Sequence, residues 1–152
     1  NFSEFEFISG SLSAISKLTQ LFCRIIIVTN QQGIGKGIMS ESDLHSLHLK
    51  MQQKIEKFGG KINKIYYCPH LAASNCLCRK PKPGMIKNAI LDFPQIVIKK
   101  SYLVGDSDSD IEAGTGAVSG SAADPIGDRK YHNLFKFEAY SPKTLITVIE
   151  NL

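Results

Sequence analysis

The chain has 152 residues, of which 43% are hydrophobic and 21% charged, a composition typical of one globular domain. Its longest aliphatic run, residues 25–28, is far too short to span a bilayer. The formal net charge of +4 suits a small anionic substrate and is too low to indicate a nucleic-acid partner. No segment has the pattern of a signal peptide, so we expect a cytoplasmic protein that does not enter membranes. We also expect a monomer.

The N-terminal part predicts a helix followed by a strand. Apolar residues recur every three positions over residues 11–21, which is the spacing of an amphipathic helix. Cys23 then has the character of a small buried residue. Residues 24–28, RIIIV, form a continuous β-branched run, which is typical of a strand buried on both faces of a parallel sheet.

Four polar residues, Thr29, Asn30, Gln31 and Gln32, follow this strand directly. The carboxyl ends of buried parallel strands are where open α/β sheets bind ligands. The hydroxyl of Thr29 and the amide of Asn30 could therefore reach an anion there. A plain turn after a strand is the alternative interpretation.

Residues 40–58 predict the clearest helix of the chain. Ser40 and Asp43 have the spacing of a capping box, and Gly59-Gly60 would end the helix. Its apolar face would consist of Leu44, Leu47, Met51, Ile55 and Phe58. His45 and His48 could be paired metal ligands, but a third ligand is missing nearby, so we expect ordinary surface or partly buried helix residues.

A strand predicted over residues 64–67 leads into a cluster of metal-ligand residues, namely Cys68, His70, Cys76 and Cys78. Three thiolates and one imidazole make a complete tetrahedral zinc shell and leave no position for water, which predicts a structural zinc site. Free loop cysteines are one alternative. A disulfide is another, but it would leave an odd cysteine in the cluster and would need an oxidising compartment.

Cationic residues follow the last of these ligands. Arg79, Lys80 and Lys82 alternate with prolines at positions 81 and 83. A rigid metal loop would hold these cations in a fixed place, which suits an anion such as phosphate. A helix is predicted over residues 83–91, with Pro83 near its first turn.

A third strand, predicted over residues 101–104, ends in an acidic run. Asp106, Asp108 and Asp110 lie within this run, and carboxylate oxygens suit magnesium or calcium. A calcium loop is excluded because positions 111 and 117 are Ile and Ala. The alternative interpretation is that these residues cap a helix over 109–116. The metal site and the cap are compatible if Asp110 caps the helix while Asp106 binds the metal.

The C-terminal part gives weaker patterns. We expect a strand near residues 117–122 and an edge strand over 134–138. Ser141 and Pro142 favour the start of a last helix, whose apolar face would carry Leu145, Val148, Ile149 and Leu152.

Four motifs, VTNQQGIGKG, CPHLAASNCLC, RKPKPGM and LVGDSDSD, together resemble the haloacid dehalogenase superfamily of phosphatases. The resemblance covers nearly the whole chain and weakens after Gly120. It is strongest to the branch that removes the 7-phosphate of D-glycero-D-manno-heptose 1,7-bisphosphate, a sugar of lipopolysaccharide biosynthesis. Its sibling, histidinol-phosphate phosphatase, shares the zinc loop. The resemblance implies a Rossmann-like α/β fold, with a parallel sheet and helices on both faces. It also implies that the protein uses Mg²⁺ and Zn²⁺.

The same resemblance implies roles for individual residues. Thr29 with Asn30 would hold the transferring phosphoryl group, and Lys80 would neutralise its charge. Arg79 would contact the distal part of the substrate, and Asp106 would bind magnesium. The expected substrate-binding residues are Thr29, Asn30, Gln31, Gln32, Arg79, Lys80 and Ser107.

In this superfamily the nucleophile is an aspartate in an Asp-x-Asp-Gly motif after the first strand. The sequence has no such motif, and its residues 2–10 resemble the segment that normally follows it. We therefore expect a single domain, residues 1–152, without its first central strand. Strands 24–28 and 101–104 would then have unpaired edges, and the chain alone would be inactive and poorly soluble. The alternative is a non-catalytic zinc-stabilised domain that binds a phosphorylated ligand.

Overall fold

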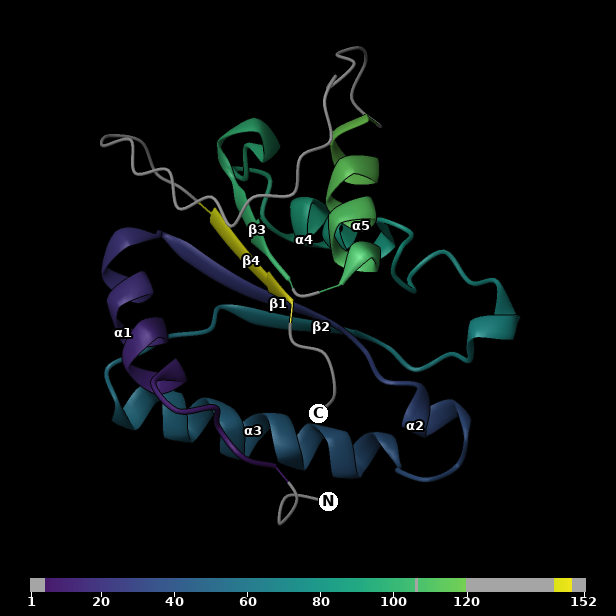
Figure 1. The fold of residues 1–152 in the computed structure, drawn as a ribbon, viewed down its shortest axis with the longest axis horizontal. Helices are drawn as coiled ribbons and strands as arrows, with labels where there is room; N and C mark the ends of the chain where they lie inside the picture. Colours follow the sequence, from purple (N-terminus) through teal and green to yellow (C-terminus); the bar gives the residue numbers. More distant parts are fainter. Residues whose placement is uncertain (1–4, 106, 120–143, 149–152) are drawn as a thin grey trace.

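The computed structural model describes residues 5–105, 107–119 and 144–148 (Figure 1). A sheet has the strand order β2-β1-β4-β3, and all three pairings are parallel. Its strands are β1 (Arg24–Asn30), β2 (Lys64–Cys68), β3 (Tyr102–Val104) and β4 (Thr144–Val148). Because these strands are parallel, their carboxyl ends meet at one edge of the sheet.

Helices cover both faces of this sheet. The described helices are α1 (Ser11–Leu21), α2 (Gln32–Gly35), α3 (Glu41–Lys57), α4 (Gly84–Asp92) and α5 (Asp108–Ser119). Figure 1 shows α1 and α3 on one face and α4 and α5 on the other. The predicted Rossmann-like α/β fold is confirmed. Within the described part of the chain, no helix is long and apolar enough to cross a membrane.

Strand β1 lies at the centre of two apolar cores. Ile26 and Val28 pack in the core that includes Met85 of α4. Ile25 and Ile27 point to the opposite face, into the core that includes Met51 of α3. Because successive side chains alternate between faces, residues 25–28 must be apolar at every position. The predicted doubly buried strand is confirmed.

The helix α3 begins as its sequence predicts. The hydroxyl of Ser40 accepts a hydrogen bond from the backbone N–H of Asp43 (3.1 Å), and the Asp43 carboxylate accepts one from the N–H of Ser40 (3.0 Å). This capping box satisfies two N–H groups that the first turn leaves unpaired. The apolar face is buried except for Phe58, which follows the helix and is exposed. Cys23 is also exposed, so its predicted burial is wrong.

The C-terminal predictions were wrong where the structure describes them. Residues 144–148, expected in a helix, form β4, because a strand between two parallel strands accepts the apolar and β-branched run TLITV at every position. Helix α5 continues to Ser119, so no strand begins at residue 117. The rest of the range 117–122 and the expected strand over 134–138 lie outside the described residues.

Strand β4 also corrects the expectation about sheet edges. It pairs with β1 on one side, with Ile146 opposite Ile26, and with β3 on the other, with Ile146 opposite Leu103. The edges of β1 and β3 that were expected to lack a partner are therefore both paired. The position expected to be missing from the sheet is filled from the other end of the sequence.

Candidate functional site

The carboxyl edge of the sheet gathers most of the predicted site residues. Thr29 and Asn30 end β1, Cys68 ends β2, and Ser107 follows β3 at the start of α5. These residues are far apart in sequence and meet because the strands are parallel. Asp106, the predicted magnesium ligand, lies outside the described residues.

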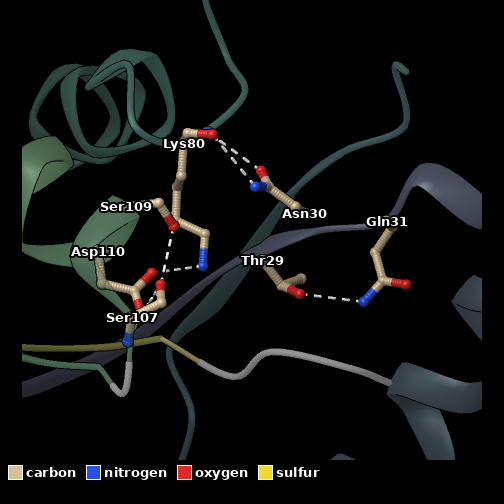
Figure 2. A network of polar contacts seen from close by, with 7 residues as sticks. All are labelled: Thr29, Asn30, Gln31, Lys80, Ser107, Ser109 and Asp110. Carbon is tan, nitrogen blue, oxygen red and sulfur yellow. Dashed lines mark hydrogen bonds and ion pairs between the residues drawn. The ribbon is translucent and has the colours of Figure 1, made fainter. Parts of the chain in front are cut away.

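Lys80 is held in a buried ion pair. Its Nζ lies 2.7 Å from Oδ1 of Asp110, and the two side chains are 1% and 0% exposed (Figure 2). Two charges removed from water in this way are stable only as a hydrogen-bonded pair. The geometry therefore fixes the Lys80 ammonium at the carboxyl edge of the sheet.

Asp110 was predicted to cap α5 and is more than a cap. Its Oδ2 accepts hydrogen bonds from the backbone N–H (3.2 Å) and the hydroxyl (2.9 Å) of Ser107, while Oδ1 binds Lys80. Gly105 lies so close that a Cβ there would be 2.5 Å from this carboxylate. Sequence reasoning missed the ion pair, because two residues thirty positions apart give no local pattern. The signal was a third carboxylate in the acidic run, four positions after Asp106 in the sequence.

Asn30 contacts the main chain of Lys80. Its Oδ1 accepts from the N–H of Lys80 (3.1 Å), and its Nδ2 donates to the carbonyl of Lys80 (3.3 Å). Figure 2 shows Asn30 reaching this backbone while the Lys80 side chain turns toward Asp110. Asn30 thus ties the cationic segment to the end of β1.

Thr29 and Gln31 form a separate buried pair. The Thr29 hydroxyl accepts a hydrogen bond from Nε2 of Gln31 (3.0 Å), and the backbone N–H of Gln31 binds the carbonyl of Cys68 (2.7 Å). Both side chains are buried. Gln31 therefore connects the end of β1 with the start of the metal loop, residues 68–78, which carries the four predicted metal ligands. Gln32 begins the short helix α2.

The predicted metal ligands converge. The ligand atoms of Cys68, His70, Cys76 and Cys78 all lie within 4.8 Å of one another. The Sγ atoms of Cys68 and Cys78 are 3.1 Å apart, and Nδ1 of His70 is 3.3 Å from Sγ of Cys78. A tetrahedral zinc shell with bonds of about 2.0–2.3 Å has edges of roughly 3.5–3.8 Å. Five of the six separations, at 3.1–3.6 Å, are close to that range, and the sixth, between His70 and Cys76, is within 4.8 Å. These residues could hold one metal ion.

The cysteines differ in their electrostatic environment. Burial raises the pKa of Cys68 to about 12, and the Cys78 thiol beside it acts in the same direction. Burial also acts to raise the pKa of Cys76, but the backbone N–H of Arg79 and the neighbouring thiols outweigh it and lower that pKa to about 6. A divalent cation would bind all three as thiolates and release their protons.

Two cationic side chains that follow the metal-ligand cluster donate hydrogen bonds back to residues within the loop. Lys82 donates from Nζ to the carbonyl (2.9 Å) and the side-chain oxygen (2.6 Å) of Asn75. Arg79 donates to the carbonyl of His70 (3.3 Å). Two of the three predicted phosphate-binding cations are thus engaged with the loop, and Lys80 alone of the three is buried.

Among the described residues, His45 and His48 do not belong to a cluster of three or more potential metal ligands. His48 is 6% exposed and packs edge-on against Tyr67, with 6.0 Å between ring centroids. Burial, with a smaller effect of His45, lowers the pKa of His48 to about 4. His45 is exposed, so the two imidazoles have different surroundings.

A parallel sheet with helices on both faces defines an α/β domain, and the buried lysine at its carboxyl edge agrees with the haloacid dehalogenase type that the four motifs resemble. The family model described as polynucleotide kinase 3 phosphatase matches residues 1–142, and the chain belongs to this family.

Similar proteins are phosphatases by name. The chain is 42% identical to D-glycero-beta-D-manno-heptose-1,7-bisphosphate 7-phosphatase of Neisseria meningitidis, over 76% of this chain and 61% of the relative. It is 33% identical to the alpha-heptose counterpart of Mycobacterium bovis, over 90% of this chain and 78% of the relative. The crystal structure of D,D-heptose 1,7-bisphosphate phosphatase from B. bronchiseptica, complexed with magnesium and phosphate, matches with a TM-score of 0.71 and 34% identity, over 77% of this chain and 65% of that one.

The chain thus spans about three fifths of the length of the Neisseria relative it matches.

Proposed function

We propose that the protein is a magnesium-dependent phosphomonoesterase that removes the 7-phosphate of D-glycero-D-manno-heptose 1,7-bisphosphate. The observation that carries this proposal is the buried Lys80–Asp110 ion pair at the carboxyl edge of the sheet, in a chain whose relatives bear this activity in their names. A fixed, water-excluded cation stabilises charge on a transferring phosphoryl group better than a mobile one.

Thr29 and Lys80 would bind the phosphoryl group. The Thr29 hydroxyl already accepts a hydrogen bond from Gln31, so its own proton is available to donate to a phosphate oxygen. The Lys80 ammonium donates a hydrogen bond to Oδ1 of Asp110, which fixes its position. Both donors would thus be preorganised. Gln32, Arg79 and Ser107 remain proposed contacts to the rest of the substrate.

Two metal ions are part of the proposal. Magnesium would neutralise the phosphate oxygens, and Asp106, directly after Gly105 at the end of β3, is the proposed ligand from this chain. Zinc would be bound by the four converged ligands of the loop and would be structural, because the protein fills all four positions. The chemistry of three thiolates and one imidazole favours zinc over magnesium.

The resemblance assigns the nucleophile to an Asp-x-Asp-Gly motif, which this sequence does not contain. The residues of this chain would therefore bind and stabilise, while the nucleophilic aspartate would come from a segment that is not among these 152 residues. We propose that the protein acts as a cytoplasmic monomer on a small phosphorylated sugar, without a nucleic-acid partner.

The test is phosphate release measured with magnesium and with a chelator. The substrates are both anomers of heptose 1,7-bisphosphate and, as the competing candidate, histidinol phosphate. The 152-residue chain is compared with a version extended at its N-terminus by a strand that ends in Asp-x-Asp-Gly. We expect magnesium-dependent loss of the 7-phosphate from the extended version and none from the 152-residue chain.

Each other outcome has a meaning. Faster release from histidinol phosphate would move the protein to the sibling branch. Release from the 152-residue chain would require a different nucleophile. If the extended version binds phosphate but hydrolyses neither substrate, the non-catalytic alternative is correct.

A further inference from the structure

Asn30 ends β1 with a side chain whose two polar atoms are both engaged by one residue. Its Oδ1 accepts from the N–H of Lys80 at 3.1 Å, and its Nδ2 donates to the carbonyl of Lys80 at 3.3 Å. A carboxamide that pairs with both groups of one residue in this way imitates the pairing of a neighbouring strand. Asn30 therefore fixes the position and the orientation of the Lys80 main chain.

The segment that carries Lys80 needs such a support. Residues 79–83 form turns and bends rather than a helix or strand, so they have no regular ladder of hydrogen bonds. Position 81 is proline, which has no N–H to donate. The pairing with Asn30 instead connects this segment to a strand fifty positions earlier.

Lys80 is consequently held at both ends. Asn30 on β1 holds its main chain, and Asp110 on α5 holds its Nζ at 2.7 Å. A lysine side chain has four rotatable bonds and loses up to about 2 kcal/mol of conformational entropy when it is fixed. Two supports from different elements keep the ammonium in place before any ligand arrives.

We propose that Asn30 is a positioning residue that places Lys80 for the transferring phosphoryl group and does not itself bind phosphate through its carboxamide. The reaction named in this proposal rests on the proposed function, whereas the contact between Asn30 and Lys80 does not.

The first test needs no activity. Asn30→Leu removes both hydrogen bonds, and Asn30→Asp keeps the acceptor for the Lys80 N–H but loses the donor to the carbonyl. Asn63→Leu is the matched control, because Asn63 makes the same kind of bond to the N–H of Ile25 (2.8 Å) near the opposite end of β1. The measurements are hydrogen exchange of the Lys80 amide by NMR and acetylation of Lys80 relative to exposed Lys61 by mass spectrometry.

With Asn30→Leu we expect exchange of the Lys80 amide and relative acetylation of Lys80 to rise at least tenfold. With Asn30→Asp the amide should stay protected while acetylation rises. Asn63→Leu should leave both values unchanged. If Asn30→Leu does not fold, Asn30→Asp decides the question. Acetylation that is unchanged in every folded Asn30 variant would overturn the proposal.

The second test uses the catalytic assay and a double-mutant cycle with Lys80→Ala. A positioning role predicts that Asn30→Leu lowers kcat and adds little further loss when Lys80 is already alanine. Independent phosphate contacts would instead give losses that multiply, which would contradict the proposal. If no variant hydrolyses any phosphate ester, the proposed function fails, and the exchange and acetylation results still decide the role of Asn30.

Discussion

At the scale of single residues, Lys80 and Asp110 depend on each other. Replacing either one alone leaves the other as an unpaired buried charge, which costs about 3–5 kcal/mol of folding free energy. We therefore expect Lys80→Met and Asp110→Leu each to destabilise the chain by that amount, and the double variant to lose much less than the sum. Denaturant unfolding of the four proteins measures this coupling. Additive losses would show that the ion pair does not act as a unit.

The catalytic consequence of Lys80 is a separate prediction. In the protein that has the proposed activity, Lys80→Ala should lower kcat about a hundredfold or more, because a preorganised charge contact is lost. Lys82→Ala, which changes a cation two positions away that already binds Asn75, is the matched control and should lower kcat far less. A Lys80→Ala protein with normal turnover would show that the phosphoryl-binding cation has been placed wrongly.

His48 predicts a pH dependence of stability. Its pKa is about 4 in the folded chain and near 6.5 when unfolded, so the unfolded state binds more protons between these values. The free energy of unfolding should therefore fall as pH drops from 6.5 to 4, by up to about 1.4 kcal/mol per pH unit from this group. His48→Phe keeps the ring contact with Tyr67 and should remove this part of the slope, as urea titrations at several pH values can measure.

The sequence predicted these residues unevenly. Thr29 and Lys80 could be found, because Thr29 directly follows a buried strand and Lys80 follows the cluster of metal-ligand residues. Asp110 as a partner of Lys80 and Asn30 as its main-chain support could not be found. Both contacts join residues thirty or fifty positions apart, and only the tertiary packing brings them together.

At the scale of elements, the metal loop is closed by contacts outside its four ligands. The two hydrogen bonds from Lys82 hold Asn75, whose φ of 45° is unusual for a residue other than glycine. A Cβ on Gly84, the first residue of α4, would overlap the backbone of Leu77 and lie 2.9 Å from Cα of Cys78. The loop is therefore packed against the start of α4.

This packing predicts how fast the proposed zinc ion is lost. Lys82→Ala should weaken zinc binding by up to about 10–100-fold, the range seen when supports of metal ligands are removed, and should therefore speed zinc release. Lys87→Ala, on the exposed side of α4, is the matched control and should leave release unchanged. Competition with a chromogenic chelator gives the rates. Equal rates in the two variants would mean that the bonds to Asn75 do not support the site.

Elements with strong local signals were predicted well. The helix over 11–21 agrees with α1 residue for residue, and the capping box of α3 is formed as its spacing indicated. The C-terminal segment was predicted as a helix, because Leu145 and Val148 fit a helical spacing. The same residues fit a strand, and pairing with β1 and β3 decides between the two.

At the scale of the whole molecule, β4 determines whether the sheet is continuous. It lies between β1 and β3. The resemblance places there the first central strand, which ends in the Asp-x-Asp-Gly motif. The expected poor solubility of the chain rested on two bare strand edges, and β4 covers both. An added N-terminal strand with the Asp-x-Asp-Gly motif would have to displace β4 to reach the same place.

Truncation tests the role of β4 directly. A chain that ends at residue 143 would lose β4 and leave β1 and β3 with unpaired inner edges, which template aggregation. A chain that ends at residue 148 keeps all three parallel pairings and is the matched control. We expect the shorter chain to aggregate and the longer one to stay monomeric in light scattering and sedimentation. If the chain ending at 143 is as monomeric and as stable as the control, β4 does not hold the sheet together, and the slot between β1 and β3 is open to another strand.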